Sequence, residues 1–571
     1  MPTELNVPLN IRNKYLLMFV LLLAGAITLY FPALSGEFVL DAHFVVANNP
    51  LIKNPAYLGD IFFHSLFDAF KGGHEGQLSY YRPLVLTSFL LNYMLTGNDP
   101  GGFRLVNIIL HAFNAFLIFC LVRRLYKDDL LSVLSAFFFL ILPVHEWVVN
   151  YIVGRGDLLQ TMFSLASLIF LVDYIERKKR QRLALSLVMY AAALLSREAA
   201  VVFPVFAALV VFRFVKELSH RQSTQSPLHV QKAIGILSLF VLTSALYVLA
   251  RNAFFPIVTD SALLAPNAAG IWLWIRICLE YAMRFLFPWV LASSWGVFHH
   301  PVFDLFVIIG SLCLLIFYLG KREDAYFRRV ILFGLCWLAF SGLTLYPTRN
   351  LFEKLGPYLS EHFLYFPAIG FVLILSSLLI SLHKKSTRVI PGVAIYYVGL
   401  LLVANSYWTT EQSLLLRVFM KEKKEAVAYQ QLLMKYIDSV PLIEKMIAQE
   451  KKASLKSLWM KRLGNVYRKH GRHPLAIVKL REAVRLNPKN LSAAVELAVC
   501  YLETGRTGDG LALLHEITVE DPRNNEAERI LGEYFQYAGD CTHALAHFKK
   551  ALALDPDDNV TARHIADCLQ K

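Results

Sequence analysis

The chain has 571 residues, of which 56% are hydrophobic and only 18% are charged. Soluble domains usually carry about 25% charged residues, so this composition argues against a soluble protein. The formal net charge is +14. Because the excess lies largely in short loops between apolar runs, membrane orientation explains it better than a nucleic-acid partner, and we expect none.

Apolar segments recur along the first two thirds of the chain. A helix that crosses a bilayer needs about 20 mostly apolar residues, and eleven segments meet or nearly meet this length. The first is longer than a signal-peptide core, so we expect it to be retained as a membrane helix. The sequence therefore predicts an all-α, polytopic membrane helix bundle of about 11 spans. The segments start near Tyr15, Arg104, Leu131, Leu158, Leu183, Ala199, Ile234, Val302, Val330, Phe363 and Ile390.

Two further apolar stretches, 83–95 and 271–287, are predicted to lie in the membrane interface. The first is short, and the second carries Arg276, Glu280 and Arg284 on one helical face. Both features suit an interfacial helix better than a spanning one. The alternative for the three charged residues is an intrahelical ladder of ion pairs.

The basic residues predict the orientation of the bundle. With eleven spans, alternate loops collect 21 Lys and Arg residues, and the other loops are poor in them. Because positive residues stay in the cytoplasm, the N-terminus is predicted to be cytoplasmic. An odd number of spans then puts everything after Trp408 on the periplasmic, extracellular or lumenal side, in a bacterial inner membrane or an endoplasmic reticulum membrane.

A 34-residue period marks the C-terminal part of the chain. Large and small residues recur in three copies in the order that the tetratricopeptide repeat requires. Such helix pairs stack into an α-solenoid with a concave binding face, which implies a protein or peptide partner, although homo-oligomerisation and plain scaffolding are alternatives. The period is seen in Leu463, Leu497 and Leu531; Gly464, Ala498 and Gly532; Gly471, Gly505 and Gly539; and Pro488, Pro522 and Pro556.

We therefore expect three regions. Residues 1–410 form a polytopic membrane domain, 411–456 a helical linker or degenerate repeat, and 457–571 the tetratricopeptide repeats. Residues 560–570 read as a capping helix. The seven cysteines form no CxxC motif and indicate neither a disulfide framework nor a cysteine metal site.

Asp41 is the first candidate functional residue. It follows the first predicted span and has apolar residues on both sides, with Glu37 as the one other acid close by. Desolvation of such a carboxyl group raises its pKa and makes it a usable general base. The alternative is an N-cap for the helix that follows, and the sequence leaves both open.

Further charged residues cluster in the predicted outer loops. Ionisable groups near membrane-embedded sites are costly to bury and are functional candidates for that reason. His145 and Glu146 are candidate ligands, with Asp41, for a divalent metal, although scattered ligands are weak evidence for one. Arg155 is a candidate for holding an anionic head group or for pairing with Asp157.

The last candidates follow later spans. Arg197 and Glu198 read either as site residues or as a neutralised pair at the interface. Glu361 and His362 open the tenth predicted span. One candidate base with several cations suits an acceptor hydroxyl and a phosphate-bearing lipid, and we find no acid deep in a span that would indicate a proton pathway.

The order of these motifs resembles the C-type glycosyltransferase superfamily, and most closely the transmembrane and tetratricopeptide-repeat O-mannosyltransferases. The resemblance covers nearly the whole chain and lies in the order of its motifs. They are Phe38-Val39-Leu40-Asp41 with Asn49-Pro50; Tyr81-Arg82-Pro83-Leu84; Phe103-Arg104-Leu105-Val106-Asn107 with His111-Ala112; Pro143-Val144-His145 with Gly154-Arg155-Gly156-Asp157; Arg197-Glu198; Glu361-His362-Phe363-Leu364-Tyr365; and Asn405 with Trp408.

The resemblance implies a glycosyltransferase that moves a hexose, such as mannose, from a polyprenyl- or dolichyl-phosphate donor to a hydroxyl acceptor. The expected acceptor is a protein Ser or Thr, presented by the repeats. Asp41 takes the position of the catalytic acid/base. The residues implied for donor or substrate binding are Arg82, His145, Glu146, Arg155, Asp157, Arg197, Glu361 and His362.

Two other classes of function are alternatives to a glycosyltransferase. A non-enzymatic membrane scaffold that assembles partners through its repeats is the second hypothesis, because Ala42 stands where the family usually has a second acid. A transporter or lipid flippase would need inverted repeats and polar groups at mid-membrane, which the sequence lacks.

Overall fold

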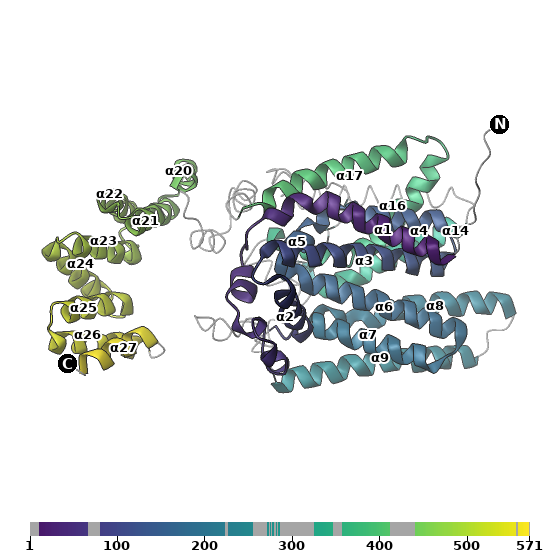
Figure 1. The fold of residues 1–571 in the computed structure, drawn as a ribbon, viewed down its shortest axis with the longest axis horizontal. Helices are drawn as coiled ribbons and strands as arrows, with labels where there is room; N and C mark the ends of the chain where they lie inside the picture. The colour runs from purple at the N-terminus through teal and green to yellow at the C-terminus, as the bar shows by residue number, and fades with distance from the viewer. Residues whose placement is uncertain are drawn as a thin grey trace. The chain divides into compact units, whose positions relative to one another are not determined.

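The computed structural model describes residues 11–66, 80–222, 227–254, parts of 271–285, 325–345, 357–410, 440–450, 452–555 and 558–569. All regular secondary structure in these residues is helical, which confirms the predicted all-α class. The chain divides into two compact units, Met1–Ala426 and Val427–Lys571, and each is described by itself (Figure 1). The expected boundaries at 410 and 456 rest on composition and stay predictions.

The first unit is a bundle of apolar helices joined by short 3₁₀ turns. Ten of the eleven predicted span positions carry a helix, and the eighth, near Val302, lies outside the described residues. The helices are α1 (Ile11–Tyr30), α2 (Pro83–Thr96), α3 (Pro100–Tyr126), α4 (Asp129–Ile141), α5 (Glu146–Asn150), α6 (Arg155–Arg177), α7 (Arg180–Ser196), α8 (Phe203–Gln222), α9 (Pro227–Phe254), α14 (Ala325–Ser341), α16 (Ala368–His383) and α17 (Val389–Asn405).

Several of these helices are long and apolar enough to cross a membrane. Six qualify among the described residues. The pair Asp129–Ile141 and Pro143–Asn150, bent by 53°, is either a seventh, broken span or a re-entrant loop. Proline removes a backbone donor and breaks the helix there. The chain is accordingly a multi-pass membrane protein, whereas the total of eleven crossings stays a prediction. The stretch 83–95 forms the 14-residue helix α2, which is too short for an ordinary span.

Helix α3 lies at the centre of the bundle, packed against α1, α4 and α6 (Figure 1). Its start is fixed by Asp99, whose carboxylate accepts the backbone N–H groups of Gly101 and Gly102. Its end is fixed by Lys127 in the left-handed conformation, and Lys178 closes α6 in the same way. The C-terminal ends of α3 and α6 therefore lie in the basic loops that the sequence predicted.

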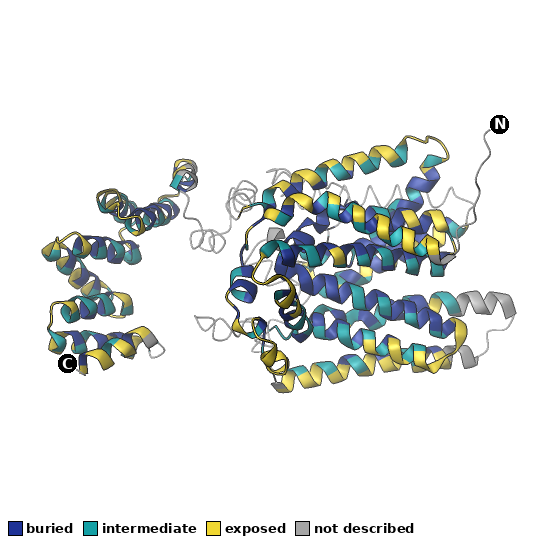
Figure 2. Cartoon of the chain, in the orientation of Figure 1, coloured by how far each residue is buried: buried dark blue, intermediate teal, exposed yellow. Residues whose placement is uncertain are grey.

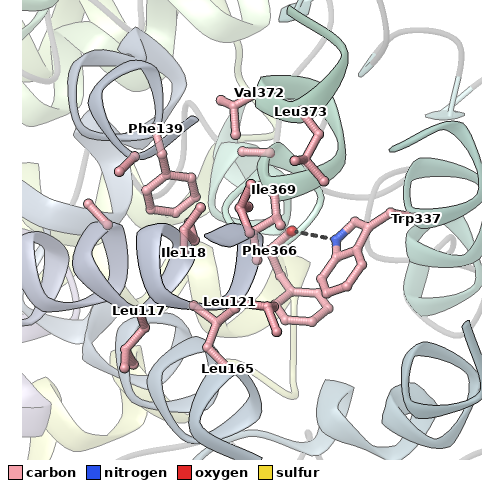
Figure 3. Packing of buried hydrophobic residues seen from close by; sticks show 14 of the residues in the cluster. Leu117, Ile118, Leu121, Phe139, Leu165, Trp337, Phe366, Ile369, Val372 and Leu373 are labelled. Carbon is pink, nitrogen blue, oxygen red and sulfur yellow. Dashed lines mark hydrogen bonds between the residues drawn. The ribbon is translucent and has the colours of Figure 1, made fainter. Parts of the chain in front are cut away.

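The core of the bundle is aromatic and aliphatic (Figure 3). Trp337 of α14 is fully buried, and its indole N–H donates to the carbonyl of Phe366 at 3.1 Å. A tryptophan buried in an apolar core needs such a partner for its single donor. The contact joins α14 to the segment that opens α16.

Residues along the outer faces of α9 and α17 are exposed (Figure 2), and many of them are large and apolar. Ile395 of α17 is 73% exposed, and Leu249 of α9 is 68% exposed. A soluble monomer rarely leaves such residues in contiguous patches, whereas hydrocarbon solvates them at no cost. This surface therefore fits a lipid environment.

A smaller core packs the connection after α1 against α2. Val45 and Val46, in the π-helical turn η2 (His43–Ala47), are buried with Phe89 of α2 and Phe103 of α3. This cluster holds the segment that carries Asp41 against the bundle. It therefore gives the candidate base a defined place rather than a free loop.

The second unit is a stack of antiparallel helix pairs (Figure 1). The glycines of the 34-residue period, Gly471, Gly505 and Gly539, have φ values of +70°, +78° and +83°. Glycine enters this left-handed region without steric cost and so closes the first helix of each pair. The helices are α20 (Val440–Gln449), α21 (Ala453–Lys469), α22 (His473–Leu486), α23 (Leu491–Glu503), α24 (Thr507–Glu520), α25 (Asn525–Tyr537), α26 (Cys541–Leu554) and α27 (Asn559–Leu569).

A glycine at the start of the Asp41 segment offers a test of the packing. A Cβ at Gly36 would lie 2.3 Å from the carbonyl oxygen of Trp408, whereas a Cβ at Gly392 would meet nothing within 4 Å. We expect Gly36→Ala to destabilise the protein by about 1–3 kcal/mol because the backbone must shift. Gly392→Ala, in an open helical position of α17, serves as the control. Thermal unfolding in detergent measures both, and equal midpoints would contradict the close approach.

Candidate functional site

Asp41 lies at the solvent-accessible edge of the small core. Its carboxylate accepts the hydroxyl of Tyr151 at 3.0 Å, while the preceding Leu40 has a φ of +52°. The following turn begins at His43 after Ala42, which offers no side-chain cap. The structure therefore pairs the Asp41 side chain with Tyr151 and not with a helix N-terminus.

The environment of Asp41 changes its acidity. The carboxyl group is accessible to water but densely surrounded by protein, and this desolvation raises its pKa above the ordinary 3.8. The hydrogen bond from Tyr151 acts in the opposite sense, because it stabilises the carboxylate, but it is the smaller effect. Such a group is a better proton acceptor than an ordinary aspartate.

Arg104 positions the segment that leads to Asp41. Its guanidinium is fully buried and donates to the backbone carbonyls of Gly36, Glu37 and Asn150. These three carbonyls belong to the segment before Asp41 and to the end of α5, next to Tyr151. One side chain of α3 thus holds in place both of the segments that carry the Asp41–Tyr151 pair.

Two ion pairs form a second cluster where α2, α6 and α7 meet. Arg82 binds Glu198 at 2.9 Å, and Arg197 binds Asp157. Asp157 also feels the charges of Arg82 and Glu198, so the four groups act as one network. These elements pack in ordinary van der Waals contact, since a Cβ at Gly156 would lie 3.4 Å from the carbonyl oxygen of Ser196 and 3.8 Å from Arg82 Nη1.

This network replaces two pairings considered from the sequence. Asp157 pairs with Arg197 rather than with its neighbour Arg155, and Glu198 pairs with Arg82 rather than with Arg197. At the start of a helix, side chains that are neighbours in sequence point in different directions. Each charged side chain therefore pairs with a residue from another element of the bundle. We call these four residues the charge network.

Tyr80 connects the charge network to Asp41. The Arg82 guanidinium lies over its ring at 4.6 Å, and its hydroxyl senses the charges of Arg82, Glu198, Arg197 and Asp41. Burial is the main cause of its raised pKa. Tyr80 therefore has the candidate base and the candidate cations within electrostatic range.

A pocket opens beside the charge network. Its cavity volume is about 20 Å³, and Arg197, Asp157 and His362 are among its lining residues. The Arg197 guanidinium also lies over the ring of Phe363 at 5.1 Å. The remaining lining is mostly apolar, from Ala199, Ala200, Val202, Phe203, Phe206, Phe366 and Pro367, with Gln160, Ser341 and Thr344.

Arg155 lies in a closed setting. It is fully buried and donates to Asn92, Asn107 and the carbonyl of Phe103, with its guanidinium 4.9 Å from the ring centre of Phe89. These are neutral acceptors on α2 and α3. In this conformation Arg155 ties three helices together and does not border the pocket.

His145 and Glu146 lie inside the bundle, where α4 bends into α5. His145 Nδ1 bonds the carbonyl of Phe139 at 2.8 Å, and Glu146 accepts the indole N–H of Trp408. Among the described residues, no group of three His, Cys, Asp or Glu side chains comes close enough to hold a metal. The His145, Glu146 and Asp41 constellation is therefore not assembled.

The last two predicted residues lie at η10 (Pro357–Leu364). Glu361 forms a buried ion pair with Arg284. Arg276 and Glu280, the other members of the suggested ladder, lie outside the described residues. His362 lines the pocket together with Arg197. Three of the predicted residues thus line the pocket, and Arg82 joins them through the charge network.

Sequence reasoning did not select Tyr80, Tyr151 or Arg104 as functional. Tyr151 contacts Asp41 although 110 positions separate them, and no local pattern marks such a pair. The signal for Arg104 was present, because an arginine inside an apolar run is costly and must be satisfied by acceptors.

Comparison with known proteins first defines the class. A family model described as dolichyl-phosphate-mannose-protein mannosyltransferase matches residues 83–247, and a tetratricopeptide repeat model matches residues 467–534. The first range runs from α2 into α9 and contains Asp157, Arg197 and Glu198 of the charge network, whereas Arg82 lies one residue before it. The resemblance to C-type glycosyltransferases, and the presence of the repeats, are therefore confirmed.

The particular relatives are protein O-mannosyl-transferases. The human protein O-mannosyl-transferase TMTC4 is 26% identical over 68% of this chain and 60% of its own length. Human TMTC1 is 27% identical over 69% of this chain and 49% of its own length, and F38B6.6 of Caenorhabditis elegans is 25% identical over 71% and 57%. The chain thus spans about half to three fifths of these relatives.

One solved structure covers only the repeats. YrrB, titled a TPR protein with an unusual peptide-binding site, is 20% identical and matches 33% of this chain and 88% of its own, with a TM-score of 0.22.

The charge network predicts a compensating pair of substitutions. Arg197→Gln leaves Asp157 as a buried carboxylate without its partner, which costs about 3–5 kcal/mol when a buried pair is broken. The double change R197Q/D157N gives a neutral pair of similar shape, and we expect it to recover most of the lost thermal stability. Unfolding midpoints in detergent measure this. If the double variant is no more stable than R197Q, the two residues are not coupled.

Proposed function

We propose that the protein transfers a hexose, mannose or a similar sugar, from a polyprenyl- or dolichyl-phosphate donor to a hydroxyl group, with a protein Ser or Thr as acceptor. The observation that carries the proposal is the neighbourhood of Tyr80, whose ring lies 4.6 Å from the Arg82 guanidinium and whose hydroxyl feels the charges of both Asp41 and Arg197. Glycosyl transfer from a phosphate needs a base on one side of the sugar and cations on the other.

Asp41 supplies the base. Its carboxylate takes the proton of the acceptor hydroxyl as the oxygen attacks C1 of the sugar. The new oxygen–carbon bond forms while the bond from C1 to the phosphate oxygen breaks, and the sugar passes through a state like an oxocarbenium ion. Attack from the face opposite the phosphate inverts C1. The phosphate leaves with the bonding electrons, so a protonating acid is less necessary.

The pocket beside the charge network supports a lipid-phosphate donor. Its volume of about 20 Å³ does not hold an isoprenoid chain in this conformation, but its lining combines apolar side chains with Arg197 and His362, which offer polar contacts to the phosphate of such a lipid. Hydrogen bonds from a guanidinium to phosphate are among the strong ones, and charge stabilisation at the leaving group lowers the barrier. We assign donor contact to Arg197 and His362, a supporting role to Arg82 and Asp157, and a structural role to Arg155.

The proposed orientation follows the basic loops. Alternation of Lys and Arg puts the N-terminus in the cytoplasm, with Asp41 and the repeats on the opposite side. The relatives' printed name, protein O-mannosyl-transferase, supports a protein acceptor. In this arrangement the repeats recruit the acceptor on the side where the sugar is transferred.

A membrane scaffold without activity is the second candidate. Ala42, in place of a second acid, favours it. However, Ala42 is fully buried within the small apolar core, so an acid there would not point into solvent beside Asp41. The alanine at position 42 is therefore weak support for a scaffold without activity.

The decisive experiment compares sugar transfer by two matched variants. Asp41→Asn keeps the shape of the side chain but removes the base, and general-base catalysis contributes about 10²- to 10⁴-fold. Glu37→Gln changes the neighbouring exposed acid and serves as the control. Transfer of radiolabelled mannose from a polyprenyl-phosphate donor in membranes measures both. We expect at least about a hundredfold loss for D41N and none for E37Q. Equal transfer by D41N and wild type removes Asp41 from the mechanism.

The hydrogen bond from Tyr151 changes the pKa of Asp41, and this predicts how the transfer rate depends on pH. The base must be ionised, so the rate falls as the pH drops through the pKa of Asp41. The hydrogen bond from Tyr151 lowers that pKa, so Tyr151→Phe raises it. The acidic limb of the rate profile is expected to move to higher pH, with little change in the maximal rate. An unshifted limb with a uniformly lower rate would make Tyr151 a structural residue only.

A further inference from the structure

The first helix pair of the repeat unit differs in charge from those that follow. Residues 453–486, which form α21 and α22, carry nine Lys and Arg and a single acid. Residues 491–555, which form α23 to α26, carry five Lys and Arg and eleven acids. The repeat unit is therefore polarised, and its basic end is the one next in sequence to the membrane unit.

The cations of this pair fall into two groups. Those that face α23 are engaged, because Lys461 donates to Ser492 at 3.0 Å and Arg468 pairs with Glu503 at 2.8 Å. By contrast, Arg472 and Arg485 have no ion pair in the described part of the chain. The charges of these two exposed arginines are therefore not neutralised by a carboxylate in the described residues.

The exposed face of α22 is also apolar. Leu475 is 46% exposed and Val478 is 56% exposed, one turn apart, and Arg481 and Arg485 continue the same face. We call these four residues the α22 outer face. Arg481 has a neutral partner, because its Nε donates to the hydroxyl of Tyr501 at 2.6 Å.

The neighbouring repeats provide an internal comparison. The four positions are exposed in all three repeats, 34 residues apart. In α24 they hold Asp509, Ala512, His515 and Val519, and in α26 they hold His543, Ala546, Lys549 and Ala553. Among these positions α24 keeps one exposed valine, and α26 has no large aliphatic residue, while neither helix has an arginine. Stacking of the repeats therefore does not require two aliphatic residues followed by two arginines, and those of α22 need another explanation.

We propose that the α22 outer face docks on a lipid surface that carries anionic head groups. Leucine and valine on an exposed helix face enter the boundary between head groups and acyl chains, and flanking arginines reach the lipid phosphates. Charge complementarity decides for this partner, since each Lys or Arg near an anionic surface adds to the attraction. The membrane unit, on the same chain, keeps such a surface within reach. The inference does not depend on sugar transfer.

A pair of spin-labelled cysteines tests the docking in the full-length chain. V478C places the label on the α22 outer face, and A512C places it at the matched position of α24, both in a background without other accessible cysteines. The protein is reconstituted in nanodiscs of phosphatidylcholine with or without phosphatidylglycerol. We expect the label at 478, and not at 512, to lose contact with a water-soluble relaxation agent and to gain contact with oxygen when phosphatidylglycerol is present.

A variant without the two arginines distinguishes an anionic lipid surface from a second copy of the chain as the partner of the α22 outer face. R481Q/R485Q in the V478C background is expected to abolish the effect of phosphatidylglycerol, and the exposed positions make loss of folding easy to check by circular dichroism. Equal accessibility of 478 and 512 in both lipids overturns the proposal. Shielding of 478 that is independent of lipid charge but grows with protein per disc also overturns it, in favour of a second copy of the chain.

Discussion

The buried arginines are the constraint on which the site depends. A guanidinium cannot lose its proton in a protein, so each one inside an apolar bundle must find acceptors or a carboxylate. Arg104 and Arg155 meet backbone carbonyls and amides, while Arg197 and Arg284 meet Asp157 and Glu361. Each of these contacts crosses between helices. The contacts of Arg155 and Arg197 fix where α2, α3, α6 and α7 meet, while Arg104 holds the segment before Asp41 against α3.

Asp41 and the charge network illustrate two ways of handling a carboxylate. Asp157 and Glu198 are neutralised by arginine partners and hold the structure. Asp41 has a tyrosine hydroxyl as its partner and stays open to water. The exposed carboxylate of Asp41 can be reached by an acceptor hydroxyl, whereas the carboxylates of Asp157 and Glu198 are occupied by guanidinium groups. The different partners therefore divide structural from chemical roles.

The repeat unit combines two kinds of surface on one solenoid. Hydrogen bonds and ion pairs join α21 to α23. The α22 outer face, by contrast, is exposed and carries both basic and apolar side chains. Docking of that face on lipid would hold the first repeat near the bilayer and leave the later, acidic repeats free. A recruiting domain held in this way would raise the local concentration of its cargo near the membrane site.

The sequence by itself determined the helical class, ten of the predicted helix positions and the repeats, because apolar run length and a 34-residue period are local properties of the chain. Gly471, Gly505 and Gly539 were readable as turns for the same reason. The partners of the charged residues were decided only by the tertiary structure. Arg155 and Asp157 are two positions apart, yet one binds neutral groups of α2 and α3 and the other binds Arg197. Successive residues of a helix point in different directions, so proximity in sequence does not predict which charge lies across the helix junction.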